Sequence, residues 1–107
     1  MHTFRIILTT TADQTQAQEL ATLLVEQRLA ACVQMLPIHS CYWWKGQVMN
    51  DEEILLLIKT RADLYEEVEA FIKEHHSYEV PEIIQLPVQQ GFKPYLNWII
   101  TNTKGEP

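Results

Sequence analysis

Residues 54–58 form a run of apolar side chains, Ile-Leu-Leu-Leu-Ile, with no polar residue among them. A strand that exposes one face to water alternates apolar and polar residues, so an unbroken run predicts a strand covered on both faces. The run ends a strand pattern over residues 48–60, and another long strand pattern precedes it over residues 31–44. Between them, Lys45-Gly46 is a tight-turn signal, because glycine takes a positive φ without strain. The sequence therefore predicts a long β-hairpin, in which Pro37 marks an interruption, a bulge or a sheet edge.

One strand and one helix are expected before this hairpin. Residues 4–10 are rich in β-branched side chains, as strands are. Asp13 is a suitable N-cap, and Gln16 three residues later completes a pattern that resembles a capping box. The helix that follows should end near Leu29, since its apolar residues recur at helical spacing: Ala17, Leu20, Ala21 and Leu24.

A second helix, a short strand and a third helix are expected after the hairpin. The second helix begins at Asp63, ends at residues 75–78, and has one apolar face made of Leu64, Val68, Phe71, Ile72 and His75. Residues 83–88 then read as a fourth strand, and residues 95–100 as a short C-terminal helix.

This order, β-α-β-β-α-β plus a C-terminal helix, is the split β-α-β or ferredoxin-like pattern of the α+β class. We expect one antiparallel sheet with strand order 4-1-3-2 and both long helices on one face. The chain has no visible linker or repeat, so residues 1–107 are predicted to form a single domain.

Element lengths predict an oligomer. The 14 residues of the second helix span about 21 Å, whereas a 13-residue strand spans about 43 Å. The helices therefore leave the hairpin tip bare, and that tip carries Tyr42, Trp43, Trp44, Val48 and Met49. A one-sided helix layer also leaves the other sheet face uncovered. A symmetric oligomer would cover both regions, although a hairpin that curls over its own domain is the alternative.

Charge and composition exclude several classes of protein. Eight basic residues, scattered singly, face fourteen acidic ones, for a net charge of −6, which disfavours nucleic acid and anionic membranes as partners. No stretch of about twenty apolar residues is present, so no membrane span is expected. The N-terminus lacks the features of a signal peptide, so we expect a cytoplasmic protein, in which Cys32 and Cys41 stay reduced.

His75 and His76 are the candidate metal ligands. Neighbouring residues on a helix point about 100° apart, so the two imidazoles converge only if the helix has already ended. In that case they form a weak surface site for copper or zinc, to which Glu79 or Glu82 adds oxygen ligands. The alternative is structural: His75 partly buried on the apolar helix face, and His76 at the helix C-terminus, where a cation is favoured.

No catalytic machinery is visible. Asp51-Glu52-Glu53 is expected to blunt an exposed strand edge or to meet a lysine, because nothing places a second catalytic group beside it. The three glycines form no phosphate-binding loop. Without a nucleophile, base and orienting group, we predict that the chain is not an enzyme.

Several short motifs, in their order and spacing, resemble those of the CutA family of divalent-cation tolerance proteins. They extend over residues 4–101 and are Leu29-Ala30-Ala31-Cys32, Tyr42-Trp43-Trp44-Lys45-Gly46, Lys59-Thr60, His76-Ser77-Tyr78-Glu79-Val80-Pro81-Glu82 and Tyr95-Leu96-Asn97-Trp98. The resemblance implies a ferredoxin-like fold, a tight homotrimer, a cytoplasmic location and a role in tolerance of copper and other divalent cations.

The resemblance also implies metal ligands. In members of the family assigned a copper site, tandem histidines after the second helix are ligands, and they match His75 and His76. That site also uses a cysteine near the end of the first strand, where this chain has Thr9. Ser77 stands where the family has proline.

A second hypothesis is a trimeric small-molecule sensor, similar in architecture to the nitrogen-regulatory PII proteins. Its cleft between subunits would be lined by Tyr42, Trp44, Glu53 and Lys59.

Overall fold

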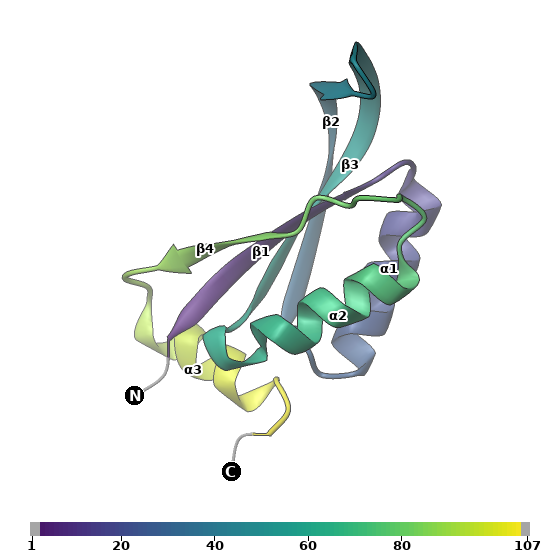
Figure 1. Ribbon diagram of the computed structural model, residues 1–107. Helices are drawn as coiled ribbons and strands as arrows, with labels where there is room; N and C mark the ends of the chain where they lie inside the picture. The colour runs from purple at the N-terminus through teal and green to yellow at the C-terminus, as the bar shows by residue number, and fades with distance from the viewer. Residues whose placement is uncertain (1–2, 106–107) are drawn as a thin grey trace.

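A computed structural model describes residues 3–105 as an antiparallel sheet with two long helices packed on it (Figure 1). The strands are β1 (Phe4–Thr11), β2 (Cys32–Trp44), β3 (Gln47–Arg61) and β4 (Ile84–Val88). The helices are α1 (Gln14–Glu26), α2 (Tyr65–His75) and α3 (Lys93–Thr101), with a 3-10 turn, η1 (Ala62–Leu64), before α2. The sheet order is β2-β3-β1-β4, which confirms the predicted 4-1-3-2 arrangement read from the other edge.

The main core lies between one sheet face and the two long helices. Its fully buried members include Ile7 of β1, Leu56 and Ile58 of β3, Leu24 of α1 and Ile72 of α2. Strand residues alternate between faces, and the register pairs Ile7 with Ile58 so that both point toward the helices. No helix within residues 3–105 is long and apolar enough to cross a membrane.

The opposite sheet face carries a second set of apolar side chains. In β3 these are Leu55 and Leu57, which are only partly buried. On the same face, Leu36 of edge strand β2 pairs with Leu55 and is 43% exposed, and Leu86 of edge strand β4 pairs with Ile6 of β1 and is 45% exposed. We call this surface the open face; its apolar members are Ile6, Leu8, Leu36, Ile38, Leu55, Leu57, Ile84 and Leu86.

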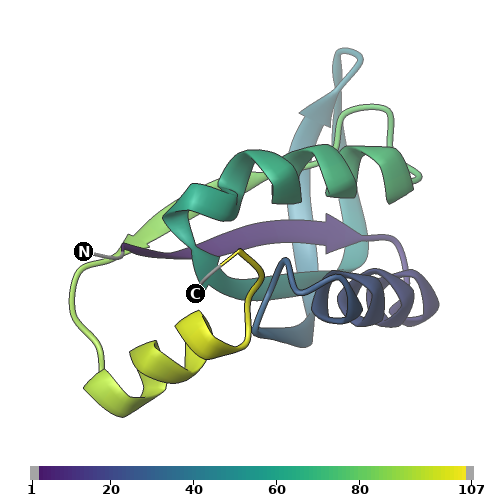
Figure 2. The ribbon, with the colours of Figure 1, turned by 90° about the horizontal axis from the view of Figure 1, so that it is seen from below.

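The β2–β3 hairpin extends beyond the helix layer, as its length predicted. Figures 1 and 2 show its tip at the end of the molecule away from α3. The molecule measures 47 × 25 × 21 Å, and its long dimension reflects this projection. Trp43 is 73% exposed, and Val48, its register partner across the hairpin, is 54% exposed.

Pro37 does not interrupt β2, contrary to one reading of the sequence. The register runs continuously from Cys32 to Trp44, and Pro37 pairs with Ile54 without a bulge. Because β2 is an edge strand, it needs N–H donors toward β3 only at alternate residues, so a proline whose nitrogen faces outward breaks no ladder bond. The predicted sheet edge is confirmed.

Both ends of α1 have local explanations. Asp13 caps its N-terminus, since its Oδ1 accepts the backbone N–H of Gln16 at 2.9 Å. The helix ends at Glu26, three residues earlier than expected, because Arg28 adopts a left-handed conformation with φ of 58°. The N–H of Leu29 then turns back to the carbonyl of Leu24 at 3.0 Å, which satisfies an end carbonyl of the helix.

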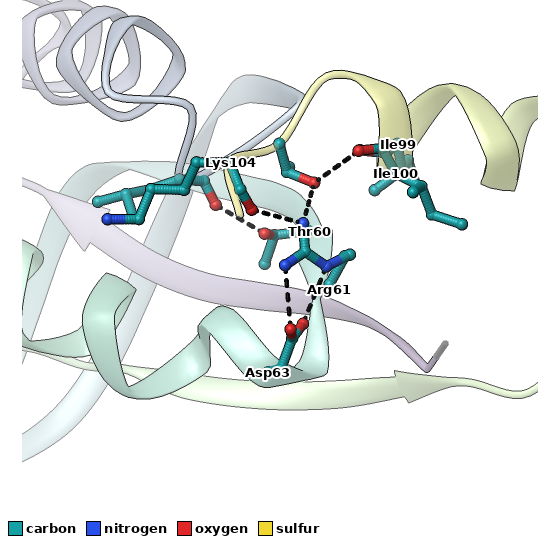
Figure 3. A network of polar contacts seen from close by, with 8 residues as sticks. Thr60, Arg61, Asp63, Ile99, Ile100 and Lys104 are labelled. Atoms are coloured by element: carbon teal, nitrogen blue, oxygen red, sulfur yellow. Dashed lines mark hydrogen bonds and ion pairs between the residues drawn. The ribbon is translucent and has the colours of Figure 1, made fainter. Parts of the chain in front are cut away.

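Arg61 attaches the C-terminal segment to the end of β3 (Figure 3). Its guanidinium is 2% exposed and donates to both carboxylate oxygens of Asp63 at 2.9 and 3.0 Å. Nη1 also donates to the Thr103 hydroxyl at 2.7 Å and to the Lys104 carbonyl at 2.8 Å. The buried charge is therefore paired and hydrogen-bonded, and it positions the chain that follows α3.

Candidate cation site

His75, the last residue of α2, presents one free ring nitrogen at the surface. Its Nδ1 lies 2.9 Å from the carbonyl oxygen of Phe71, one helical turn earlier, and its ring stacks on the Phe71 ring at 4.1 Å. A carbonyl only accepts, so Nδ1 carries a proton, and in the neutral ring Nε2 is then the nitrogen with the lone pair. The residue is exposed, not partly buried as the structural alternative expected. A histidine held this way, with Nδ1–H on a carbonyl, has the orientation typical of metal-ligating histidines.

His76 has already left the helix, with φ of −97° and ψ of 144°. Its Nε2 lies 2.5 Å from the carbonyl oxygen of Thr10 in β1, so Nε2 carries the proton and donates. Its Nδ1 accepts the backbone N–H of Tyr78 at 3.0 Å. Both ring nitrogens of the half-buried His76 are therefore engaged within the chain.

The two histidines are adjacent but have different partners, so the structure does not present them as a preformed pair. Across residues 3–105, no three His, Cys, Asp or Glu side chains gather closely enough to hold a metal ion. Imidazole suits copper and zinc, and Nε2 of His75 is the ring nitrogen of this pair for which no partner is seen among residues 3–105. Glu79 and Glu82 do not complete a third-ligand cluster with it.

Thr9 is fully buried on the helix-facing side of β1, where its register partner is Leu56. Its hydroxyl oxygen has no hydrogen-bond partner among the described residues. A hydroxyl is also a poor ligand for soft metals. Thr9 therefore does not supply the third ligand of a closed copper site.

Two phenol–carboxylate pairs lie near His76. Tyr78 donates from its hydroxyl to Oε2 of Glu53 at 2.7 Å, and Tyr42 donates to Oδ2 of Asp51. Both acids belong to β3 and lie two residues apart, so they share a face. Glu53 is only 7% exposed. The acidic run was expected to blunt a strand edge or to meet a lysine. At residues 51–53 β3 pairs with β2 alone, since β1 pairs only with residues 54–61, so the acids do lie at an unpaired edge. Two of them are bonded to tyrosines and not to a lysine.

These pairs change the acidity of both phenols. Burial, followed by the hydrogen bond to Glu53, raises the pKa of Tyr78 well above its usual value. The hydrogen bond to Asp51 is the main cause that raises the pKa of Tyr42 to about 12. In each case ionisation would place a phenolate beside a carboxylate, so the phenols act as hydrogen-bond donors and not as acids or bases near neutral pH.

Of the residues suggested for a small-molecule cleft, Tyr42 and Glu53 lie near each other, whereas Lys59 lies apart from them within one chain. Lys59 is six residues from Glu53 along β3, about 20 Å away, and its Nζ donates to Oε1 of Gln34 at 2.5 Å. Tyr42 and Trp44 are partly exposed near the hairpin tip, where Nζ of Lys45 lies 5.6 Å from the centroid of the Trp44 ring.

Fold and site together define a class: a ferredoxin-like βαββαβ protein with a C-terminal helix and a long, aromatic-tipped hairpin. The family profile described as "CutA1 divalent ion tolerance protein" matches residues 5–102. The chain belongs to this family. It is a family of tolerance proteins, not of enzymes, which confirms the prediction that the chain is not an enzyme.

Relatives agree with this assignment. The chain is 41% identical over 99 residues to "Divalent-cation tolerance protein CutA" of Thermus thermophilus, with 92% of this chain and 96% of that protein covered. It is 46% identical to mouse "Protein CutA" over 91 residues, which are 84% of this chain and 51% of the mouse protein. The chain thus spans about half the length of the mouse relative.

Solved structures confirm the fold. The crystal structure of CutA1 from Oryza sativa superposes with a TM-score of 0.94 at 37% identity, covering 97% of this chain and 96% of that one. The structure named "periplasmic divalent cation tolerance protein CutA" from Archaeoglobus fulgidus gives a TM-score of 0.90 at 37% identity, covering 95% and 98%.

Replacement of Thr9 by valine should stabilise the protein. The change removes a buried hydroxyl without a partner and keeps the side-chain shape, so we expect the free energy of unfolding to rise by about 1 kcal/mol. Thr11→Val is the matched control, because the hydroxyl of Thr11 donates to the Asp13 carbonyl at 2.9 Å and its loss should destabilise. Urea denaturation measures the free energy of unfolding of both variants. A Thr9→Val protein less stable than wild type would contradict the conclusion that the Thr9 hydroxyl is buried without a partner.

Alkaline pH should weaken the fold through the two phenols. Tyrosines of the unfolded chain ionise near pH 10, whereas Tyr42 and Tyr78 resist ionisation in the folded state. Their contribution to the free energy of unfolding is therefore complete below about pH 10 and is lost as the pH rises toward about 12. Urea denaturation at several pH values between 8 and 11.5 measures the decline.

The Tyr78→Phe variant separates the effect of the hydrogen bond to Glu53 near pH 8 from the effect of the shifted phenol pKa at alkaline pH. It should cost about 1–3 kcal/mol near pH 8, because buried Glu53 loses its donor. It should also make the alkaline decline shallower, since one shifted group is gone. If wild type and variant had equal stability near pH 8 and lost it equally steeply with rising pH, the Tyr78–Glu53 bond would not stabilise the fold as described.

Proposed function

We propose that this chain is a cytoplasmic, homotrimeric member of the family that binds Cu²⁺ or another divalent cation weakly at the end of α2, where His75 and His76 stand in tandem. The observation that carries the cation proposal is the orientation of His75. Its Nδ1–H is fixed on the Phe71 carbonyl, and its Nε2 lone pair stays available on an exposed side chain. A single open imidazole supports weak binding, not a structural metal centre.

The proposal of a homotrimer is supported by the uncovered apolar surface. The open face and the hairpin tip both carry exposed apolar side chains that α1 and α2 do not cover, and α3 packs on that side of the sheet only at its far end, against Phe4 and Val88. Water contact over two such regions is unfavourable, and neighbouring copies that bury each other's exposed strands would remove it. The number three follows from the family resemblance.

The compartment and domain organisation are also part of the proposal. Cys32 and Cys41 are unpaired, and a nine-residue separation within one extended strand keeps them from bridging each other, as suits a reducing cytoplasm. The Archaeoglobus relative is called periplasmic, so fractionation of the native cell is the direct check. We further propose that residues 1–107 act as one CutA-like domain, supported by a family match over residues 5–102.

Calorimetric titration with Cu²⁺ tests the cation proposal. We expect weak binding to wild type and an affinity lower by about tenfold or more in a His75→Ala/His76→Ala double variant, because the imidazole donor is lost. His39→Ala is the matched control, since His39 is an exposed histidine on β2, far from α2 along the chain. Equal binding by wild type and the double variant would remove these histidines from the proposal.

A further inference from the structure

Resting on the proposed cation function, we infer that the two histidines have separate roles: His75 is the imidazole that binds the cation, and His76 is a positioning residue that fastens the chain after α2 to the sheet. The family pattern treats the tandem histidines as equivalent ligands. The hydrogen bonds of this chain distinguish them.

His76 has no nitrogen to offer a cation. A neutral imidazole has one donor and one acceptor nitrogen. Here the donor, Nε2–H, is bonded to the Thr10 carbonyl, and the acceptor, Nδ1, is bonded to the Tyr78 N–H. Coordination through Nδ1 would displace the Tyr78 amide, and coordination through Nε2 would break the contact with β1.

Residues 76–78 form what we call the anchor segment, because each of them contacts a different element. His76 bonds to Thr10 of β1. The Ser77 hydroxyl donates to Oε1 of Gln16 in α1 at 2.9 Å. Tyr78 donates to the buried carboxylate of Glu53 in β3.

The anchor segment makes the position of His76 depend on three elements at once. Its bonds connect residues 25 to 66 positions apart in the chain, so they fix where the segment runs and not merely how α2 ends. Ser77 takes part only because it carries a hydroxyl, which a proline at that position would lack. If the His76 ring moved away to bind a metal ion, the Tyr78 N–H would lose its hydrogen-bond acceptor.

His75 lies outside this arrangement. Among residues 3–105, its one polar bond is to its own helix, and its ring stacks on Phe71. A cation bound at its Nε2 therefore leaves the anchor segment undisturbed. Cation binding and the attachment of residues 76–78 to the sheet are independent in this chain.

Four single variants test this division of roles. His75→Ala removes the proposed donor. His76→Ala removes both anchor bonds of the ring. His76→Asn keeps an acceptor for the Tyr78 N–H, as in an Asx turn, and His76→Gln keeps a donor that can reach the Thr10 carbonyl. Two measurements are made on each: Cu²⁺ affinity by calorimetry, and hydrogen exchange of the Tyr78 amide by NMR without metal and with saturating Zn²⁺ as the diamagnetic probe.

We expect His75→Ala to lower Cu²⁺ affinity about tenfold and to leave exchange of the Tyr78 amide unchanged. His76→Gln and His76→Asn should bind Cu²⁺ within about threefold of wild type. His76→Ala should speed Tyr78 amide exchange by about tenfold or more, with His76→Asn restoring protection. Saturating Zn²⁺ should leave the Tyr78 amide of wild type protected.

An equal loss of affinity in His75→Ala and His76→Gln, or faster Tyr78 exchange on addition of Zn²⁺, would overturn the inference, because His76 would then leave its bonds to ligate. Failure of wild type to bind any cation would instead refute the proposed function and the role of His75. The metal-free exchange of Tyr78 in His76→Ala and His76→Asn would still decide the role of His76.

Discussion

β3 is apolar on both faces, while α1 and α2 cover only one of them, and the exposed open face follows from this imbalance. Leu56 and Ile58 are fully buried under α1 and α2, whereas Leu55 and Leu57 point to the open face. Strands with two apolar faces are normally covered on both sides. A β3 that is stable in water thus requires a second layer that α1 and α2 do not provide.

The long hairpin also exposes apolar side chains that α1 and α2 do not cover. β2 and β3 extend past the helix layer, and the projecting part exposes large aromatic and aliphatic side chains, among them Trp43 and Val48. A lone hairpin of this kind invites pairing with another chain. At the other end of the sheet α3 contributes a small second core, and Arg61 attaches the chain after α3 to the end of β3. One end of the sheet is therefore completed within the chain, whereas the apolar side chains at the hairpin end stay exposed.

Features that depend on local pattern could be predicted from the sequence. The element order, the Asp13 cap and an end of α2 within residues 75–78 follow from periodicity and capping, and the exposed tip follows from comparing element lengths. The prediction for Pro37 was partly wrong because a sequence does not show which way a strand's N–H groups point. The end of α1 was misplaced because left-handed Arg28 carries no glycine or asparagine signal.

Contacts between distant residues could not be predicted in the same way. Tyr78 and Glu53 are 25 positions apart, and His76 and Thr10 are 66 apart, so no spacing rule connects them. Only the shared face of Asp51 and Glu53, two residues apart in a strand, could have suggested paired acids. The tandem histidines were visible as candidates, but which nitrogen of each ring is free depends on carbonyl and amide groups that only the fold brings near.

Sedimentation velocity of the purified chain at micromolar concentration tests the need for a second layer most directly. A chain whose open face and hairpin tip are covered by neighbouring copies should sediment as one species with three times the mass of the chain, unchanged on dilution across the micromolar range. A well-folded single subunit under those conditions would contradict the need for a second layer, because β3 would then be stable with one face of the sheet open to water.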